Sequence, residues 1–301
     1  MSEYHIPVLL KESIEALNIK SNGIYLDLTF GGGGHSKEVL KSLDKNGVLI
    51  AFDQDGDAIK NVPDDKRLKF VNHNFKYFRN FLRYYGHEGA DGILADLGVS
   101  SHEFDEAGRG FSFRYDAELD MRMNQKNDLT AVQILAEYSF EKLATIFINY
   151  GEVKNARHLA DVIIKGREIK PIITSEDLYK IIYSCIPKAK EKKYLAQVYQ
   201  ALRIEVNKEL DVLAEMLEQA LEALNKGGRL VVITYHSLED RIVKNFFKSG
   251  RADGVIIKDE IYGGVVLGFK QINRKVIIPS DEEIERNPRA RSAKLRILEK
   301  L

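Results

Sequence analysis

A run of four glycines at positions 31–34 constrains the fold of this chain more than any other feature of its sequence. The glycines follow an apolar segment that contains Asp27 near its end, and a short stretch suited to a helix, residues 36–42, comes after them. A second apolar segment, residues 48–52, then ends at Asp53. This order of strand, glycine-rich turn, helix and second strand with a terminal carboxylate is typical of a βαβ unit that holds a nucleotide-type cofactor.

Apolar and helical segments alternate over the first hundred residues. Strands are expected at residues 23–29, 48–52, 68–71 and 92–97, and a helix at residues 75–85. Because such alternation builds a parallel sheet with helices on both faces, the predicted fold class is α/β with a Rossmann-like sheet. We expect three carboxylates to meet at the edge of the sheet where ligands bind, because each lies at or near a strand end. They are Asp27, Asp53 and Asp96.

The pattern changes after residue 105, where apolar residues recur at helical spacing without intervening strands. Later, a long helix that carries Leu210 and Leu224 is expected to end at Gly227-Gly228, and a strand at residues 230–234 resumes the sheet. We therefore predict a sheet domain of residues 1–107 and 204–301. An all-helical insert, residues 108–203, interrupts it and is expected to recognise the substrate.

The composition is that of an ordinary globular protein, with 301 residues and 44% hydrophobic content. No apolar run reaches the ~18 residues of a membrane span, and the first residues lack the features of a signal peptide, so a cytoplasmic location and no membrane partner are expected. The single cysteine, Cys185, excludes an internal disulfide and a multi-cysteine metal site. Basic and acidic residues number 45 each, so any nucleic-acid contact depends on local clusters.

The glycine turn matches a dinucleotide site only weakly, because Ser36 stands where the third small residue of that motif is needed. S-adenosylmethionine fits better, since its ribose can bind a carboxylate and it has no pyrophosphate to place at a helix N-terminus. Three carboxylates also suit its cationic sulfonium and ammonium groups.

Simpler explanations exist for several of these residues. Asp53 could cap the helix that follows it, His35 could begin a helix without a ligand role, and Phe75 could be core rather than a contact of adenine. A calcium loop that starts at Asp53 is disfavoured, because Asp64 stands where the motif needs a glutamate.

Seven segments, in order along the chain, carry a family resemblance. They are residues 27–36, 91–101, 109–113, 119–123, 200–204, 236–241 and 287–292. Together they resemble the ribosomal RNA small-subunit methyltransferase H family, which methylates N(4) of a cytidine in 16S ribosomal RNA. The resemblance runs from about His5 to Leu298 and implies an S-adenosylmethionine-dependent enzyme whose partner is the small ribosomal subunit. The oligomeric state stays open, with a homodimer as one option.

The resemblance also implies contacts with the cofactor. Those expected are Gly33, Gly34 and His35 with the methionyl part, Asp53 with the ribose, Phe75 with the adenine side, Asp96 beside the methyl group, and Glu103 where the family usually has glutamine.

Methylation of an exocyclic amine requires mainly that the two reactants are positioned, and a carboxylate that accepts an amino proton would assist. Asp96 is the candidate catalytic residue, and the alternative is that it only holds the cofactor. His236 could approach the same site, although a helix cap formed by Ser237, with Asp240 following, is the simpler explanation of that motif. No metal cluster is apparent in the sequence.

Two basic clusters, residues 286–296 and 188–193, suit RNA phosphates, although solvated helix faces would explain each of them. Residues 109–115 alternate bases and rings, a composition that suits an unstacked nucleotide or else a plug between the two domains. The candidate RNA-binding residues are Arg109, Arg114, Arg122, Arg289 and Arg291.

Three other functions remain open at this point. An NAD-dependent oxidoreductase would share the sheet and Asp53, a non-catalytic RNA-binding assembly factor would need only the basic clusters, and a methyltransferase could act on another RNA or on a small molecule. Ser36 disfavours the first, and calorimetry with S-adenosylmethionine and NADH would separate the classes.

Overall fold

The structure is a computed structural model, and it describes residues 7–99, 104–256 and 267–301. The chain forms two compact units, a sheet unit of residues 1–98 and 210–301 and a helical unit of residues 99–209. These limits lie nine residues before and six residues after the predicted boundaries at 107/108 and 203/204. Helix α9 (Glu191–Asn207) continues without a break past residue 203, and Val99 and Phe104 pack against the core of the helical unit.

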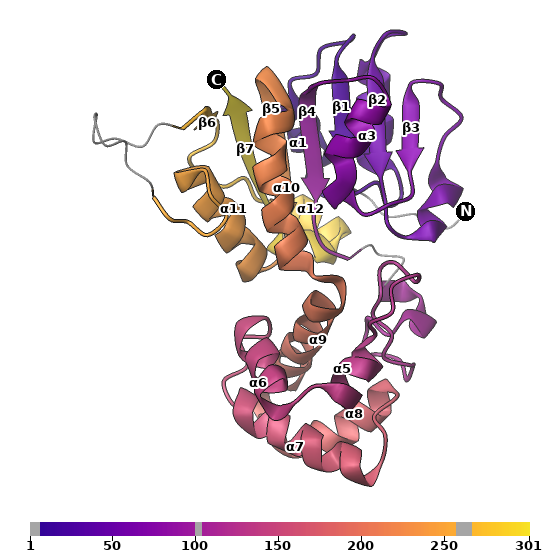
Figure 1. Cartoon of the computed structure of the whole chain (residues 1–301), viewed down its shortest axis with the longest axis vertical. Coiled ribbons are helices and arrows are strands. Elements are labelled where there is room, and N and C mark those ends of the chain that lie inside the picture. The colour runs from indigo at the N-terminus through magenta and orange to yellow at the C-terminus, as the bar shows by residue number, and fades with distance from the viewer. Residues whose placement is uncertain (1–6, 100–103, 257–266) are drawn as a thin grey trace. The chain divides into compact units, whose positions relative to one another are not determined.

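The sheet unit contains a seven-stranded sheet in the order β3-β2-β1-β4-β5-β7-β6 (Figure 1). Strands β1 to β5 run parallel, whereas β7 is antiparallel to both β5 and β6. The strands are β1 (Ile24–Asp27), β2 (Val48–Phe52), β3 (Leu68–Val71), β4 (Ala90–Asp96), β5 (Leu224–Thr234), β6 (Phe269–Gln271) and β7 (Lys294–Lys300). The predicted α/β class is confirmed, and β2 and β3 have the predicted bounds.

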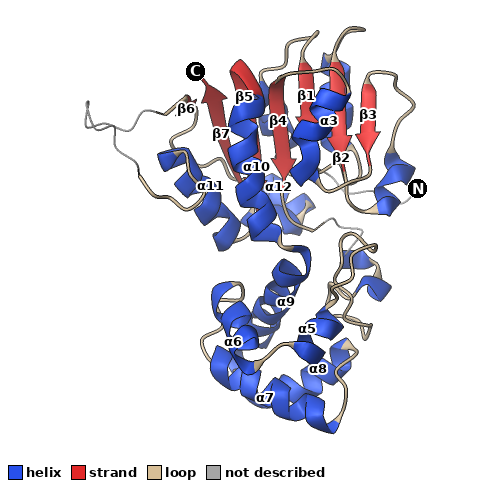
Figure 2. Cartoon of the chain, in the orientation of Figure 1, coloured by secondary structure: helices blue, strands red, loops and turns tan. Residues whose placement is uncertain are grey.

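Helices cover both faces of the sheet, as Figure 2 shows for α3, α10 and α11 on one of them. Alternate strand residues enter two cores: Ile50 and Phe52 pack with α3, α10 and α11, whereas Leu49 and Ala51 pack with α1 and α2. The helices of this unit are α1 (Leu10–Leu17), α2 (Gly34–Ser42), α3 (Phe78–Tyr84), α10 (Glu209–Ala223), α11 (Ser237–Ser249) and α12 (Asp281–Arg286), with 3-10 helices η1 (Gly56–Asn61), η2 (Phe75–Tyr77) and η6 (Pro288–Ser292).

The junction between α10 and β5 differs from the prediction. Helix α10 ends at Ala223 rather than at Gly227-Gly228, and Leu224 already pairs with Ala90 of β4. The next pair between β4 and β5 joins Gly92 to Arg229, so residues 225–228 form a bulge in β5. Within this bulge Gly227 has a φ of 77°. The glycines therefore permit a bulge within the strand and do not stop the helix.

The helical unit has its own core, which contains the buried Cys185 and the buried apolar residues of its helices, whereas Phe140 and Ile181 are partly buried against it. Its helices are α5 (Ala131–Glu137), α6 (Phe140–Asn149), α7 (Ala156–Ile169), α8 (Ser175–Ile182) and α9, with 3-10 helices η3 (Ala107–Arg109), η4 (Tyr183–Cys185) and η5 (Lys188–Lys190). Among the described residues, no helix is both long enough and apolar enough to cross a membrane.

Candidate active site

The glycine turn joins β1 to α2 and is fastened by Asp53. The backbone N–H of Gly31 donates a hydrogen bond to Asp53 Oδ2 at 2.7 Å, and Asp55 N–H donates to Oδ1 at 2.9 Å. Gly31 and Gly33 have φ values of 52° and 74°, which residues with a side chain rarely adopt. Two of the roughly four acceptor positions of the Asp53 carboxylate remain for another donor, such as a hydroxyl group.

Asp27 and Ser36 form a buried pair beneath this turn. The Ser36 hydroxyl donates to Asp27 Oδ2 at 2.6 Å, and Thr29 N–H donates to Oδ1 at 3.1 Å. Burial raises the pKa of Asp27, and these two hydrogen bonds oppose the rise. Ser36, which argued against a dinucleotide, therefore joins the N-terminus of α2 to the end of β1.

Asp96 is the last residue of β4. Because β2 and β4 both run parallel to β1, the end of β4 lies at the same edge of the sheet as Asp53 and the glycine turn. Oδ1 of Asp96 accepts a hydrogen bond from the Tyr235 hydroxyl at 2.7 Å, and its Oδ2 lies 3.8 Å from Nδ1 of His35. Burial raises the pKa of Asp96 to about 7, although the Tyr235 hydrogen bond opposes the rise. Burial likewise raises the pKa of Asp53, to about 6. The sequence did not point to Tyr235, whose only signal is its place directly after β5.

The remaining predicted cofactor residues are placed as follows. His35 is buried in the first turn of α2, where its Nε2 lies 3.1 Å from the carbonyl oxygen of Val8. Phe75 begins η2, four residues beyond the end of β3 at Val71, and is half-buried against the core that contains α3. Glu103 lies outside the described residues.

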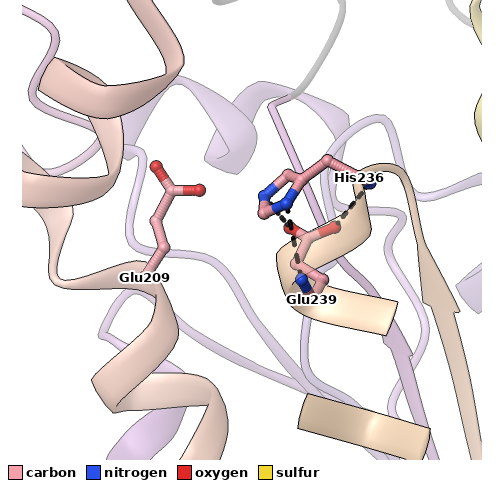
Figure 3. Close-up of side chains that lie close together, drawn as sticks. All are labelled: Glu209, His236 and Glu239. Atoms are coloured by element: carbon pink, nitrogen blue, oxygen red, sulfur yellow. Dashed lines mark hydrogen bonds and ion pairs between the residues drawn. The ribbon is translucent and has the colours of Figure 1, made fainter. Parts of the chain in front are cut away.

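His236 and Glu239 form the N-terminal cap of α11, which Figure 3 shows with both side chains labelled. Glu239 N–H donates to Nδ1 of His236 at 3.4 Å, and the Glu239 carboxylate accepts from the backbone N–H groups of Tyr235 and His236. The expected cap by Ser237 and Asp240 is therefore wrong by one residue: Ser237 already lies inside the helix. Glu209, also labelled, accepts two hydrogen bonds from Arg203 at 2.8 Å.

Two of the three arginines proposed to bind RNA in the helical unit are held by protein groups. Arg109 is 5% exposed, and its Nη2 donates to the carbonyl oxygens of Arg122 and Met123. Arg122 donates twice to Asp120, and its Nη1 donates to two further carbonyl oxygens. Both residues therefore hold the loop, whereas Arg114 is exposed, and contact of these arginines with RNA stays a prediction.

The basic cluster near the C-terminus is divided in a similar way. Arg289 and Arg291 are exposed. Lys294 and Arg296, on β7, donate instead to the Asp240 carboxylate at 3.0 and 2.9 Å. In the other cluster the lysines 188, 190, 192 and 193 are all exposed, around the start of α9.

This strand order, with an antiparallel β7 beside β5 and carboxylates at the edge next to a glycine turn, defines a Rossmann-like methyltransferase. The chain belongs to the MraW methylase family, whose model matches residues 2–301. The oxidoreductase alternative is set aside by this result.

Relatives that share most of the sequence carry one name. "Ribosomal RNA small subunit methyltransferase H" of Parabacteroides distasonis is 58% identical over 299 residues, which cover 99% of this chain and 98% of the relative. The protein of the same name from Flavobacterium johnsoniae is 54% identical over the same shares of the two chains. Among solved structures, an rRNA methylase from Streptococcus thermophilus aligns with a TM-score of 0.42 and 13% identity, covering 97% of this chain and 93% of that one.

Proposed function

We propose that this protein transfers the methyl group of S-adenosylmethionine to N(4) of a cytidine in the 16S RNA of the small ribosomal subunit, in the cytoplasm. The proposal rests on one observation: Asp53 and Asp96 flank the glycine turn at the edge of the sheet. The chain that carries this edge is 58% identical to a protein named ribosomal RNA small subunit methyltransferase H. Family membership supports methyl transfer, and the names of the relatives support ribosomal RNA as the substrate.

The residues at this edge fit the cofactor in shape and in charge. Burial raises the pKa of Asp53 and of Asp96, which indicates that their negative charges lack compensation within the protein. A cationic ligand would supply it. Gly34 lies so close to Pro7 that even a methyl side chain would collide with it, whereas an added Cβ at Gly31 would meet no atom within 4 Å, so the turn leaves a bare backbone surface at Gly31 on which a ligand can lie.

Bound at this edge, S-adenosylmethionine supplies an electrophilic methyl group. The chain must hold the cytosine amine in line with that group and receive a proton from it. We assign the proton acceptor to Asp96, because a carboxylate with a pKa of about 7 is ionised in part of the population at neutral pH and still binds a proton well. Asp53 is assigned to the ribose.

The proposal is tested by methyl transfer from labelled cofactor to intact small subunits and to bare 16S RNA, followed by nucleoside analysis. The expected product is N(4)-methylated cytidine. A label found in another nucleoside, or no label in RNA at all, would contradict the substrate assignment.

The cofactor assignment has a separate test. Asp53→Ala removes the acceptor for ribose hydroxyls and for Gly31 N–H, and we expect S-adenosylmethionine to bind about tenfold more weakly or worse by calorimetry. Asp57→Ala, in η1, is the control and should leave the affinity unchanged, because this side chain is 38% exposed and pairs with Lys60. Equal affinities for the two variants would remove Asp53 from the site.

A further inference from the structure

A pocket of about 340 Å³ opens in the sheet unit next to the end of β5. Residues 235–237, 278–279, 284 and 291–294 line it, and all of them belong to the sheet unit. Pockets that bind small ligands begin at about this volume, so there is room for one nucleotide rather than for a helix of RNA. None of the cofactor contacts predicted from the sequence lies among the lining residues.

Tyr235 connects this pocket to the proposed proton acceptor. Tyr235 lines the pocket, and its hydroxyl group donates a hydrogen bond to Asp96 Oδ1 at 2.7 Å. The ring also packs over Gly98, where an added Cβ would lie 3.1 Å from it, so the glycine allows the ring this position. A ligand in the pocket would therefore contact a residue that is hydrogen-bonded to Asp96.

The walls of the pocket differ in chemistry. Ile278, Pro279 and Ile284 provide an apolar wall that suits the face of a base. Two cationic side chains, Arg291 and Lys294, also line the pocket, but Lys294 binds Asp240 at 3.0 Å. Among the described residues no carboxylate lies within ion-pair distance of the exposed Arg291, and its charge is available for a phosphate.

We propose that this pocket binds the target nucleotide of the RNA, with the pyrimidine against Ile278 and Pro279, the phosphate on Arg291, and the exocyclic amine directed past Tyr235 toward Asp96. This inference rests on the proposed function. It requires that the nucleotide leaves its base stack, as enzymes that act on single bases require.

The first test measures kcat and KM for small subunits, together with the Kd for S-adenosylmethionine, in Arg291→Gln. We expect KM to rise at least fivefold, because the RNA phosphate would no longer meet a cation, and the cofactor Kd to stay within twofold. Arg274→Gln is the matched control: Arg274 is also an exposed arginine, and it does not line the pocket. It should leave both constants unchanged.

The second test fills the pocket. Ser292 is exposed at its rim, so Ser292→Trp should fold with an unchanged Tm and cofactor Kd, yet lose at least 90% of methyl transfer. If Ser292→Trp weakens S-adenosylmethionine binding instead, the pocket holds the cofactor and the inference is overturned.

The two proposals fail in different ways. If Arg291→Gln matches Arg274→Gln and Ser292→Trp methylates normally, the pocket is not the nucleotide site, while the proposed function stands. If the unchanged protein makes no N(4)-methylated cytidine in small subunits, the proposed function itself fails.

Discussion

Ionisation of Asp96 destabilises the folded protein, but the proposed reaction needs the ionised form. The side chain is only 15% exposed, and its pKa of about 7 lies above the ordinary value for aspartate. A carboxylate whose folded-state pKa exceeds its unfolded value binds more protons in the folded state, so it lowers the free energy of unfolding as pH rises from about 4 to about 7. The same ionisation creates the proton acceptor.

We therefore expect Asp96→Asn to raise the free energy of unfolding of the cofactor-free protein at pH 8 by about 1–3 kcal/mol. Urea denaturation at pH 8 and pH 5 measures this effect, and the gain should shrink at pH 5, where Asp96 is protonated. Methyl transfer should fall at least 100-fold. Equal effects of the substitution at the two pH values would show that ionisation of Asp96 does not destabilise the folded protein.

Tyr235 is a positioning residue, since it acts through Asp96. Burial keeps the pKa of Tyr235 well above its usual value, so the hydroxyl retains its proton and donates to Asp96. Tyr235→Phe removes a hydrogen bond that lowers the pKa of Asp96, so the rise of kcat with pH should move to higher pH by about half a unit to one unit. A pH profile of kcat with saturating cofactor tests this, since a role in packing alone would lower kcat without moving the profile.

At the scale of elements, the loop that precedes α5 is held by the end of α9. Asn207 is 8% exposed; its Oδ1 accepts from Met123 N–H at 2.8 Å, and its Nδ2 donates to the carbonyl oxygens of Met121 and Arg203. Met121 has a φ of 60°, a strained conformation that these hydrogen bonds maintain. No sequence motif marked Asn207, because its partners in the loop lie more than 80 residues away.

Asn207→Asp keeps the size of the side chain but turns its donor into an acceptor that faces two carbonyl oxygens. We expect the free energy of unfolding to fall by about 2–4 kcal/mol, measured by urea denaturation. Asn127→Asp, at an exposed position in the same unit, is the control and should change it by less than about 0.5 kcal/mol. A decrease of the same size in both variants would mean that the added charge, rather than the missing donor, is responsible.

The elements that the sequence predicted best are those with strong local patterns. β2 and β3 are short apolar runs bounded by turn residues, and their predicted bounds are those observed. Long-range partners were beyond reach: the burial of Arg109, the pairing of Lys294 and Arg296 with Asp240, and the hydroxyl of Tyr235 on Asp96 all depend on packing. The charge of a residue is visible in a sequence, but its partner is not.

For the whole molecule, the lysine cluster and the carboxylates of the proposed cofactor site belong to different units. The exposed lysines at residues 188–193 belong to the helical unit, whereas Asp53 and Asp96 belong to the sheet unit. RNA affinity and cofactor affinity should therefore respond separately to substitution.

The double variant Lys190→Gln and Lys193→Gln should make RNA binding less sensitive to salt. The slope of log K against log salt should become shallower by about 0.7 for each phosphate of single-stranded RNA that the variant no longer neutralises. Lys154→Gln with Lys165→Gln removes the same charge elsewhere in the helical unit and should leave the slope unchanged. If both pairs alter the slope equally, the cluster acts only through net charge.

The position of the helical unit within the chain also sets an order of events during synthesis. β4 and β5 are neighbours in the sheet, yet the helical unit separates them in sequence, and the Asp96–Tyr235 hydrogen bond spans 139 positions. At about 5–20 residues per second, the ribosome needs roughly 7–28 s to make that stretch. Until then β4 has an unpaired edge. A nascent chain that lacks β5 therefore has no Tyr235 to bind Asp96. We expect the chain to become active only after β5 has been synthesised and has paired with β4.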